Sequence, residues 1–352
     1  MFVCSRRYFL LLVTLLLGSV TGVAQQPNSS GMKVRTGPPP RTIHLDVLVT
    51  SRPGVVVTGL SRQDFAVMDG KTTAEITSFE AMDANKQPVE ALILIDAVNT
   101  GYTEIAQERI QIDKFLRANG GKLMLPTTLA VFGGQGIKVQ GGYTRGGNQL
   151  ADALAKYTIG LREIGRSASV EGAEERLSDS IKAIRLLTQY ASQRPGRKII
   201  LWVSPGWPLL SGPQVNLTET QLTAIFNDVT WLSTTLREGH TSVYSVNPLG
   251  VSESVEQAFY YEQFTKGVKK SSDVMVGNLA LQVLANETGG LVRNSTDVSG
   301  LLQECVADNV AYYRLSFEPP PTEKRDVYHT LKVTVARPGA TVMTSTGYYD
   351  QP

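Results

Sequence analysis

The sequence is poor in the residues that most often build catalytic and metal sites. It contains three histidines and two cysteines in 352 residues. His44, His240 and His329 lie in or just before predicted strands, and the sequence has no Gly-x-Ser-x-Gly motif. A serine hydrolase needs a base beside its nucleophile, and a zinc site needs clustered His and Cys ligands. We therefore expect a non-enzymatic protein, with a hydrolase that has no recognisable motif as an alternative.

An excess of charge of one sign is also missing. The chain has 34 Lys and Arg against 32 Asp and Glu, and its longest basic runs are the pairs Arg6-Arg7 and Lys269-Lys270. Chains that bind nucleic acid usually carry a basic excess or a basic stripe, so we expect no nucleic-acid partner. A hydrophobic content of 42% and a charged content of 19% are typical of a globular protein with a sizeable core.

Long apolar runs are scarce, and the one near the start is too short for a membrane span. Residues 9–20 are almost entirely apolar, follow Arg6-Arg7, and precede small residues that end at Ala24. A spanning helix needs roughly 20 apolar residues. The pattern therefore predicts a secretory signal peptide over residues 1–24. We expect export to the periplasm, the cell surface or the medium, with no membrane span after cleavage.

The scarcity of cysteine excludes an intrachain disulfide in the exported chain. Cys4 lies in the predicted signal peptide, which leaves Cys305 alone. Cys305 falls in an apolar helical pattern, so it is predicted to be a buried small hydrophobe and not a reactive thiol. The stability of the mature protein then depends on its hydrophobic core.

Hydrophobic periodicity divides the remaining chain into four segments. Residues 25–41 are rich in Pro, Gly and Ser and predict a flexible lead-in. Residues 42–84 show short alternating runs that predict an N-terminal β-unit. Residues 88–298 alternate apolar strands with helices, which predicts an α/β domain with a doubly wound, mostly parallel sheet. Residues 299–352 predict a helix and a second β-unit, and the two β-units can pair into a small β-sandwich.

The α/β segment predicts ten helices and strands, together with a short strand at residues 137–139 as the hairpin partner of the strand at residues 129–132. Gly133-Gly134-Gln135-Gly136 predicts a hairpin turn, since no helix and no Lys-Ser/Thr pair follow it as in a phosphate loop. Gly289-Gly290 marks the end of the last helix. Strands are expected at residues 91–95, 129–132, 199–203, 241–246 and 291–293. Helices are expected at residues 104–118, 148–157, 171–191, 219–237 and 278–288.

Three groups of motifs together resemble one family. They are Leu45–Thr50 with Val57–Leu60 and Asp64-Phe65, then Leu92–Asp96, and last Leu284–Gly290 with Tyr312–Leu315 and Gly347–Tyr349. In this order they are similar to the von Willebrand factor A-related (VWFA-related) domain family that is abundant in acidobacteria. The resemblance spans residues 42–350. It implies a bacterial protein with a von Willebrand A fold, in which helices cover both faces of a mostly parallel sheet.

The resemblance also implies a Mg²⁺ site at the carboxyl end of the sheet. Such a site takes an Asp-x-Ser-x-Ser loop, a Thr from a second loop and an Asp from a third, because Mg²⁺ needs near-octahedral oxygen ligands. Here the first loop reads Asp96-Ala97-Val98-Asn99-Thr100, the second-loop Thr aligns near Glu175, and Pro205 replaces the third-loop Asp. We expect no metal and no other cofactor, with Asp96 and Thr100 as vestigial ligands and Asp96 accepting hydrogen bonds from loop N–H groups. A Mg²⁺-dependent module that recruits Glu175 or Asp179 is the alternative.

The same edge of the sheet is the predicted binding site for a protein partner. Ligands of open α/β sheets bind outside the carboxyl ends of the strands, and aromatic side chains among polar ones are typical of protein interfaces. For Trp207, packing within its own loop is an equal alternative. The chain is thus predicted to be a protein-binding module for adhesion, assembly or scaffolding. The predicted rim consists of Asp96, Asn99, Thr100, Tyr102, Ser204 and Trp207.

Overall fold

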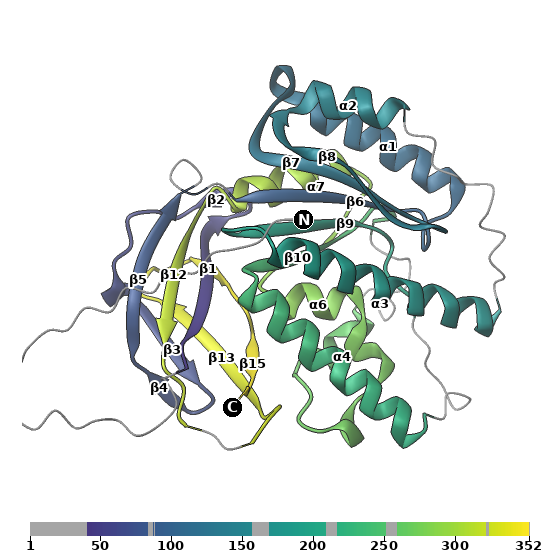
Figure 1. Ribbon diagram of the computed structural model, residues 1–352. Helices are drawn as coiled ribbons and strands as arrows, with labels where there is room; N and C mark the ends of the chain where they lie inside the picture. The colour runs from purple at the N-terminus through teal and green to yellow at the C-terminus, as the bar shows by residue number, and fades with distance from the viewer. Residues whose placement is uncertain are drawn as a thin grey trace, which may run out of the picture. The chain divides into compact units, whose positions relative to one another are not determined.

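The computed structural model describes residues 41–83, 87, 89–156, 169–208, 217–250, 259–321 and 324–351. The predicted signal peptide and all but the last residue of the lead-in lie outside these residues. The described chain has a mixed α/β part with a six-stranded sheet, and a part made of two antiparallel sheets (Figure 1). No helix among the described residues is long and apolar enough to cross a membrane.

The six-stranded main sheet has the strand order β11-β10-β9-β6-β7-β8. All of its strands run parallel except the edge strand β8, which forms an antiparallel hairpin with β7. The central strands β6 and β9 are buried along nearly their whole length, which explains their continuous apolar runs. The strands are β6 (Glu90–Asp96), β7 (Lys122–Gly133), β8 (Gly136–Gly146), β9 (Lys198–Val203), β10 (Thr241–Asn247) and β11 (Val292–Asn294).

Helices cover both faces of the main sheet. Side chains of a strand alternate between its two faces, so Ile93 and Ile95 belong to one core and Leu92 and Leu94 to the other. The first core contains α1 (Tyr102–Arg117), α2 (Gly147–Lys156) and α7 (Val298–Asp308), which lie together in Figure 1. The second contains α3 (Val170–Ser192), α4 (Glu219–Glu238) and α6 (Leu281–Glu287). Short 3-10 helices are η1 (Arg62–Asp64), η2 (Ala118–Gly121), η4 (Tyr260–Phe264), η5 (Ser271–Asp273) and η6 (Val276–Leu279).

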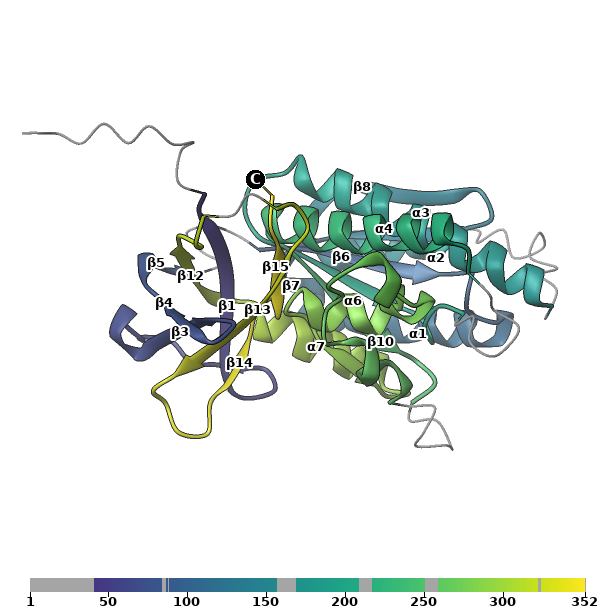
Figure 2. The ribbon, with the colours of Figure 1, turned by 90° about the horizontal axis from the view of Figure 1, so that it is seen from below.

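The two β-units pair with each other, as the alternating pattern predicts. One sheet has the order β14-β1-β12-β5 with β2 beside β1, and the other has the order β15-β13-β3-β4 (Figure 2). Their inner faces share one apolar core that includes Leu45, Val67, Leu315 and Val333. We call this pair of sheets the sandwich. Its strands are β1 (Ile43–Arg52), β2 (Val55–Val56), β3 (Phe65–Asp69), β4 (Thr72–Ala74), β5 (Ile76–Asp83), β12 (Ala311–Phe317), β13 (Tyr328–Val335), β14 (Thr341–Met343) and β15 (Gly347–Tyr349).

Three elements of the α/β part differ most from the sequence prediction. Strand β8 extends over Gly136–Gly146, well beyond the predicted strand at residues 137–139. Strand β7 starts at Lys122, several residues before the predicted run, because Leu123 and Leu125 are buried between more exposed neighbours in a strand-like alternation. The helix predicted at residues 278–288 is split into η6 and α6, because Ala280 has an extended backbone with ψ 144. Cys305, on α7, is fully buried in the core, as predicted, and burial raises the pKa of its thiol to about 12.

A buried ion cluster joins the sandwich to the amino end of the main sheet. Asp46 of β1 receives Arg314 Nε at 3.0 Å and His240 Nδ1 at 3.0 Å, and lies 3.7 Å from the Arg197 guanidinium. Burial disfavours the carboxylate, but the hydrogen bond from His240 and the charges of Arg197 and Arg314 outweigh burial and lower the pKa of Asp46 to about 2. The opposite, carboxyl end of the sheet is left for the site described next.

Candidate functional site

The candidate site lies where β6 and β9 end and two loops meet. The first loop, residues 96–100, follows β6, and the second, residues 204–208, follows β9. The two strands pair in parallel, with Ile95 opposite Val203, so both loops leave the same edge of the sheet. This is the edge at which α/β sheets commonly bind ligands.

The carboxylate of Asp96 is saturated by hydrogen bonds within this edge. Its Oδ1 accepts the backbone N–H groups of Val98 and Asn99, both at 2.9 Å. Its Oδ2 accepts Asn99 Nδ2 at 2.8 Å and Trp202 Nε1 at 2.9 Å. Burial raises the pKa of Asp96, and these donors act in the opposite direction. A carboxylate has about four lone-pair sites, so these contacts account for all of them.

The donor set at this edge does not fit a Mg²⁺ ion. The lone pairs of Asp96 are engaged by N–H donors, Val98 is buried and offers no side-chain oxygen, and Pro205 stands in the third loop. Among the described residues, no group of three or more His, Cys, Asp or Glu side chains could hold a metal. Thr100 Oγ1 is buried and has no hydrogen-bond partner within the described chain.

Ser180 is the residue of α3 that contacts the first loop, whereas Glu175 of the same helix points to solvent. Glu175 is exposed on α3. Ser180, also on α3, is fully buried, accepts Asn99 Nδ2 at 2.9 Å and donates to the carbonyl of Arg176 at 2.7 Å. A neutral hydroxyl of α3 thus holds the first loop against that helix.

The six predicted rim residues lie at this edge but differ greatly in exposure. Asp96 and Ser204 are completely buried and Thr100 is 9% exposed, so these three side chains pack beneath the surface of the loops. Trp207 is 4% exposed, so most of its side chain packs inside the protein, as the loop-packing alternative expects. Tyr102 is 71% exposed, while Asn99 is half-buried.

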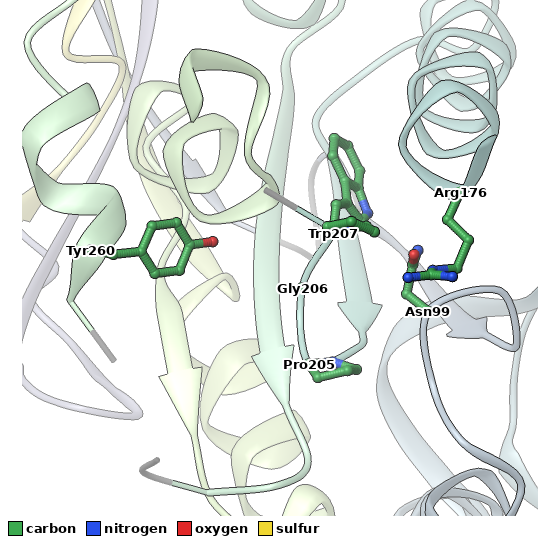
Figure 3. A pocket seen from close by; sticks show the side chains of 7 residues that line it. Asn99, Arg176, Pro205, Gly206, Trp207 and Tyr260 are labelled. Atoms are coloured by element: carbon green, nitrogen blue, oxygen red, sulfur yellow. The ribbon is translucent and has the colours of Figure 1, made fainter. Parts of the chain in front are cut away.

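Trp207 forms one wall of a pocket on this edge. Its ring packs edge-on against Trp202, with ring centroids 5.1 Å apart, and so connects the pocket wall to the Asp96 hydrogen bonds. The pocket has a volume of about 390 Å³, at the small end of the range of about 300–1,000 Å³ for ligand sites. We call it the edge pocket (Figure 3). It is lined by Asn99, Arg176, Pro205, Gly206, Trp207, Pro208 and Tyr260.

Glycine and proline residues set the backbone conformation of the second loop beside the edge pocket. Gly206 has φ +112, a backbone conformation that favours glycine, and a Cβ there would displace the end of the Gln282 side chain of α6, whose Nε2 would lie 2.6 Å away. Tyr260, across the pocket in Figure 3, donates its hydroxyl to Gln282 Oε1 at 3.3 Å. Pro205 and Pro208 further restrict the loop backbone.

No protein-family model matches the sequence, and no curated protein shows significant sequence similarity to it. Among solved structures, the human COPII-coat protein Sec24c aligns with a TM-score of 0.37 and 8% identity over 74% of this chain and 43% of its own. The chain thus spans less than half the length of that Sec24c chain. The manganese-loaded Plasmodium vivax TRAP protein aligns with a TM-score of 0.34 and 8% identity over 76% and 96%, respectively. The TFIIH p34 N-terminal domain aligns with a TM-score of 0.28 and 14% identity over 64% and 99%.

A serine–histidine contact does occur, but in the sandwich and not at the edge pocket. His44 Nδ1 lies 2.8 Å from Ser316 Oγ, because the two residues face each other on β1 and β12. Ser316 is 3% exposed, and the nearby carboxylate of Asp46 is bound by Arg314 and His240. Burial and the charge of His240 lower the pKa of His44. The contact is accounted for as a cross-strand pair.

Sequence reasoning missed three side chains that shape this edge. The sequence predicts Trp202 only as an apolar residue of a buried strand. The strand register then shows that its indole reaches Asp96. Arg176 and Tyr260 come from segments far from the two loops along the chain. No spacing in the sequence connects them to the loops, although Arg176 stands in the acidic start of a predicted helix, where a single cation is conspicuous.

Glu108 is a buried carboxyl group under the first loop. It is 1% exposed, and neither of its oxygens has a hydrogen-bond partner within the described residues. Burial, together with the negative charge of Asp96, raises the pKa of Glu108 to about 9, against an ordinary 4.5. The folded protein therefore keeps Glu108 protonated at neutral pH.

Replacing Glu108 with glutamine is expected to stabilise the protein at neutral pH. Because the folded-state pKa is raised, the contribution of Glu108 to stability is fully present below about pH 4.5 and is lost as pH rises toward about 9. At pH 7 Glu108→Gln should recover about 3 kcal/mol, from 1.36 kcal/mol for each pKa unit. Urea unfolding across this pH range measures it. Glu174→Gln on the exposed side of α3 is the control, and an unchanged pH slope in Glu108→Gln would show that Glu108 is ionised when folded.

Proposed function

We propose that this chain is a metal-independent protein-interaction module whose binding site is the edge pocket. The observation that carries the proposal is the set of side chains around the pocket. Arg176, Trp207 and Tyr260 line it, and Arg, Trp and Tyr are the residue types that dominate binding energy at protein interfaces. The pocket also occupies the edge of the sheet where α/β folds bind ligands. In this proposal the core is a doubly wound, von Willebrand A-like domain with a degenerate metal site.

Metal independence is supported by the chemistry of Asp96. A metal-dependent module would need this carboxylate to give up N–H donors and bind a cation with few other oxygen ligands nearby. A Mg²⁺ ion keeps several water ligands but still needs one or two carboxylates. We therefore prefer a module that binds through side chains alone to the Mg²⁺-dependent alternative. The role proposed is non-enzymatic, in adhesion, assembly or scaffolding.

The proposed place of action is outside the cytoplasm. This part depends on the sequence pattern of residues 1–24, where a basic pair, a short apolar run and small residues are typical of a secretory signal. The partner is accordingly proposed to be a protein of the cell envelope or of the surroundings. No nucleic acid is proposed, given the balanced charges.

Photo-crosslinking from the pocket tests the proposed function. With benzoyl-phenylalanine in place of Tyr260, we expect capture of a defined partner from envelope extracts, equally with EDTA and with Mg²⁺. The same probe in place of Leu186, which is 56% exposed on α3 but does not line the pocket, should capture none of it. Equal capture from both positions would place the contact elsewhere. Capture that EDTA abolishes would favour the Mg²⁺-dependent alternative.

A further inference from the structure

Two of the three histidines, His44 and His240, meet where the sandwich joins the main sheet. Their ring centroids are 6.3 Å apart. His44 lies on β1 between Ile43 and Leu45, which point into the sandwich core, so its own side chain lies on the outer face of the sheet. His240 lies in the turn between α4 and β10. Both rings reach solvent, since His44 is exposed and the side chain of His240 is 23% exposed.

Each of these two rings is held through one nitrogen and leaves the other free. Nδ1 of His44 lies 2.8 Å from Ser316 Oγ, and Nδ1 of His240 lies 3.0 Å from Asp46 Oδ2. Within the described residues, no hydrogen bond is formed to Nε2 of either ring. A carboxylate or another polar group on one ring nitrogen is the arrangement that orients metal-bound histidines. Both rings therefore present an oriented nitrogen that can bind an ion.

The backbone of His240 is a further sign that its side chain is needed there. Its φ of 49 lies in the left-handed region, where residues with a side chain are uncommon. Glycine adopts this conformation without strain and is the residue that most often follows a helix in it. The imidazole at this position gives what glycine lacks, a bond to Asp46 across the junction and a free ring nitrogen.

The spacing of the two rings fits two ligands of one ion. Metal–imidazole bonds are about 2.0–2.1 Å long, which places the ring centroids of two histidines on one ion about 5–6.5 Å apart, depending on the angle at the ion. The observed 6.3 Å lies near the upper end of this range. Among the described residues, no group of three or more His, Cys, Asp or Glu side chains could hold a metal. An ion on these two rings therefore takes its other ligands from water.

The charges around His44 select the type of ion. Arg237 and Arg314 act on it as cations, and Asp46 carries the opposing charge. Mg²⁺ and Ca²⁺ take oxygen ligands, mainly carboxylates and carbonyls, so a pair of imidazoles beside two arginines does not suit them. Cu²⁺, Ni²⁺ and Zn²⁺ form strong bonds to imidazole nitrogen, and Cu²⁺ binds most tightly of the three.

We propose that Nε2 of His44 and Nε2 of His240 together bind one divalent transition-metal ion, Cu²⁺, Ni²⁺ or Zn²⁺. The site lies at the amino end of the main sheet, opposite the edge pocket, and is independent of the function proposed for that pocket. One ligand belongs to the sandwich and the other to the α/β part, so the bound ion connects the two. An ion that binds only the folded chain stabilises it by mass action.

Titration of the untagged protein with CuCl₂ and with ZnCl₂ tests the site. We expect saturable binding of one ion per chain, with Cu²⁺ bound more tightly than Zn²⁺. Saturating Zn²⁺ should raise the Tm by several degrees, and an excess of Mg²⁺ or Ca²⁺ should not compete. Electron paramagnetic resonance of the Cu²⁺ complex should show two nitrogen ligands. No saturable binding, or a complex with a single nitrogen ligand, would overturn the proposal.

Matched variants assign the two ligands. His44→Gln and His240→Asn should each weaken Zn²⁺ binding more than about tenfold, because each removes one of two protein ligands. Asparagine tolerates the left-handed backbone of His240 and still offers a donor to Asp46. His329→Gln is the control, since both ring nitrogens of His329 already contact carboxylates, and should change affinity less than about twofold. Weaker binding in only one of the two ligand variants would contradict a shared ion.

The wild type gives a readout that needs no substitution. In spectra of ¹⁵N-histidine-labelled protein, Zn²⁺ should shift the ring signals of His44 and His240 and leave those of His329 in place. A shift of His329 alone, or of all three rings equally, would overturn the assignment whatever the variants do. Crosslinking from the edge pocket does not depend on either result.

Discussion

Replacing Asp96 with alanine is expected to lower the free energy of unfolding by about 3–5 kcal/mol. The change removes the acceptor for the N–H groups of Val98 and Asn99 and for Trp202 Nε1. A buried donor left without a partner costs about 1–3 kcal/mol. The costs do not add in full, because Asn99 keeps its bond to Ser180 and the loop can relax toward water.

Urea unfolding of Asp96→Ala and of a control variant measures this loss. Glu175→Ala removes an exposed carboxylate that the sequence alignment had placed at the metal site, and should change stability by less than about 0.5 kcal/mol. Thermal unfolding of the wild type in EDTA and in millimolar Mg²⁺, Mn²⁺ or Ca²⁺ should coincide. A specific ion at about 100 times its Kd would add about 2.7 kcal/mol. Such a gain, absent from Asp96→Ala, would reverse our interpretation of the edge.

Replacing Arg197 with methionine is expected to cost about 3 kcal/mol or more. Arg197 is 2% exposed, and its Nη2 donates to Asn309 Oδ1 at 3.0 Å and to Ser242 Oγ at 3.2 Å. Its guanidinium also faces Asp46 and packs over the Tyr312 ring at 5.4 Å. Breaking a buried charge pair by removing one partner typically costs about 3–5 kcal/mol. The lower end applies, since Asp46 keeps two other partners.

The strands in which Arg197→Met loses stability test the role of Arg197 more sharply than the total loss in free energy of unfolding. Since Arg197 joins the sandwich to the main sheet, hydrogen exchange in Arg197→Met should accelerate in β1 and β12 more than in β6. Arg117→Met, which removes an exposed arginine that pairs with Asp113 and Asp152, should cost less than about 1 kcal/mol. Uniform loss of protection across all strands would mean that the cluster contributes to global stability without a special role at the junction.

Much of the fold could be predicted from periodicity. Continuous apolar runs found β6 and β9, and alternation found β1 and its partners, because burial on two faces or one face leaves a direct trace in the sequence. The loop after β6 also followed, since Asp96 at the end of a buried strand needs donors, and the nearest are loop N–H groups.

The pocket could not be predicted in the same way. Its cation, Arg176, and its far wall, Tyr260, meet the loops only through packing of α3 and η4, which no local pattern encodes. Trp202 shows the same limit at short range. Its pairing with Leu94 places the indole two residues below Asp96 on the neighbouring strand, and that register depends on the whole sheet. Contacts set by tertiary packing leave no fixed spacing in the sequence.

The central position of β1 in its sheet has a consequence for the order in which the chain is made. Strand β1 pairs with β12 on one side and with β14 on the other, and its Asp46 meets Arg314, 268 positions later. During synthesis from the N-terminus, β1 emerges long before either partner, with the N–H and C=O groups of both edges open to wrong pairing. Folding of the intervening α/β part brings the end of β5 and the start of β12 together, where Asp83 pairs with Ala311. The nascent chain must therefore keep β1 apart from other chains until translation has passed β14.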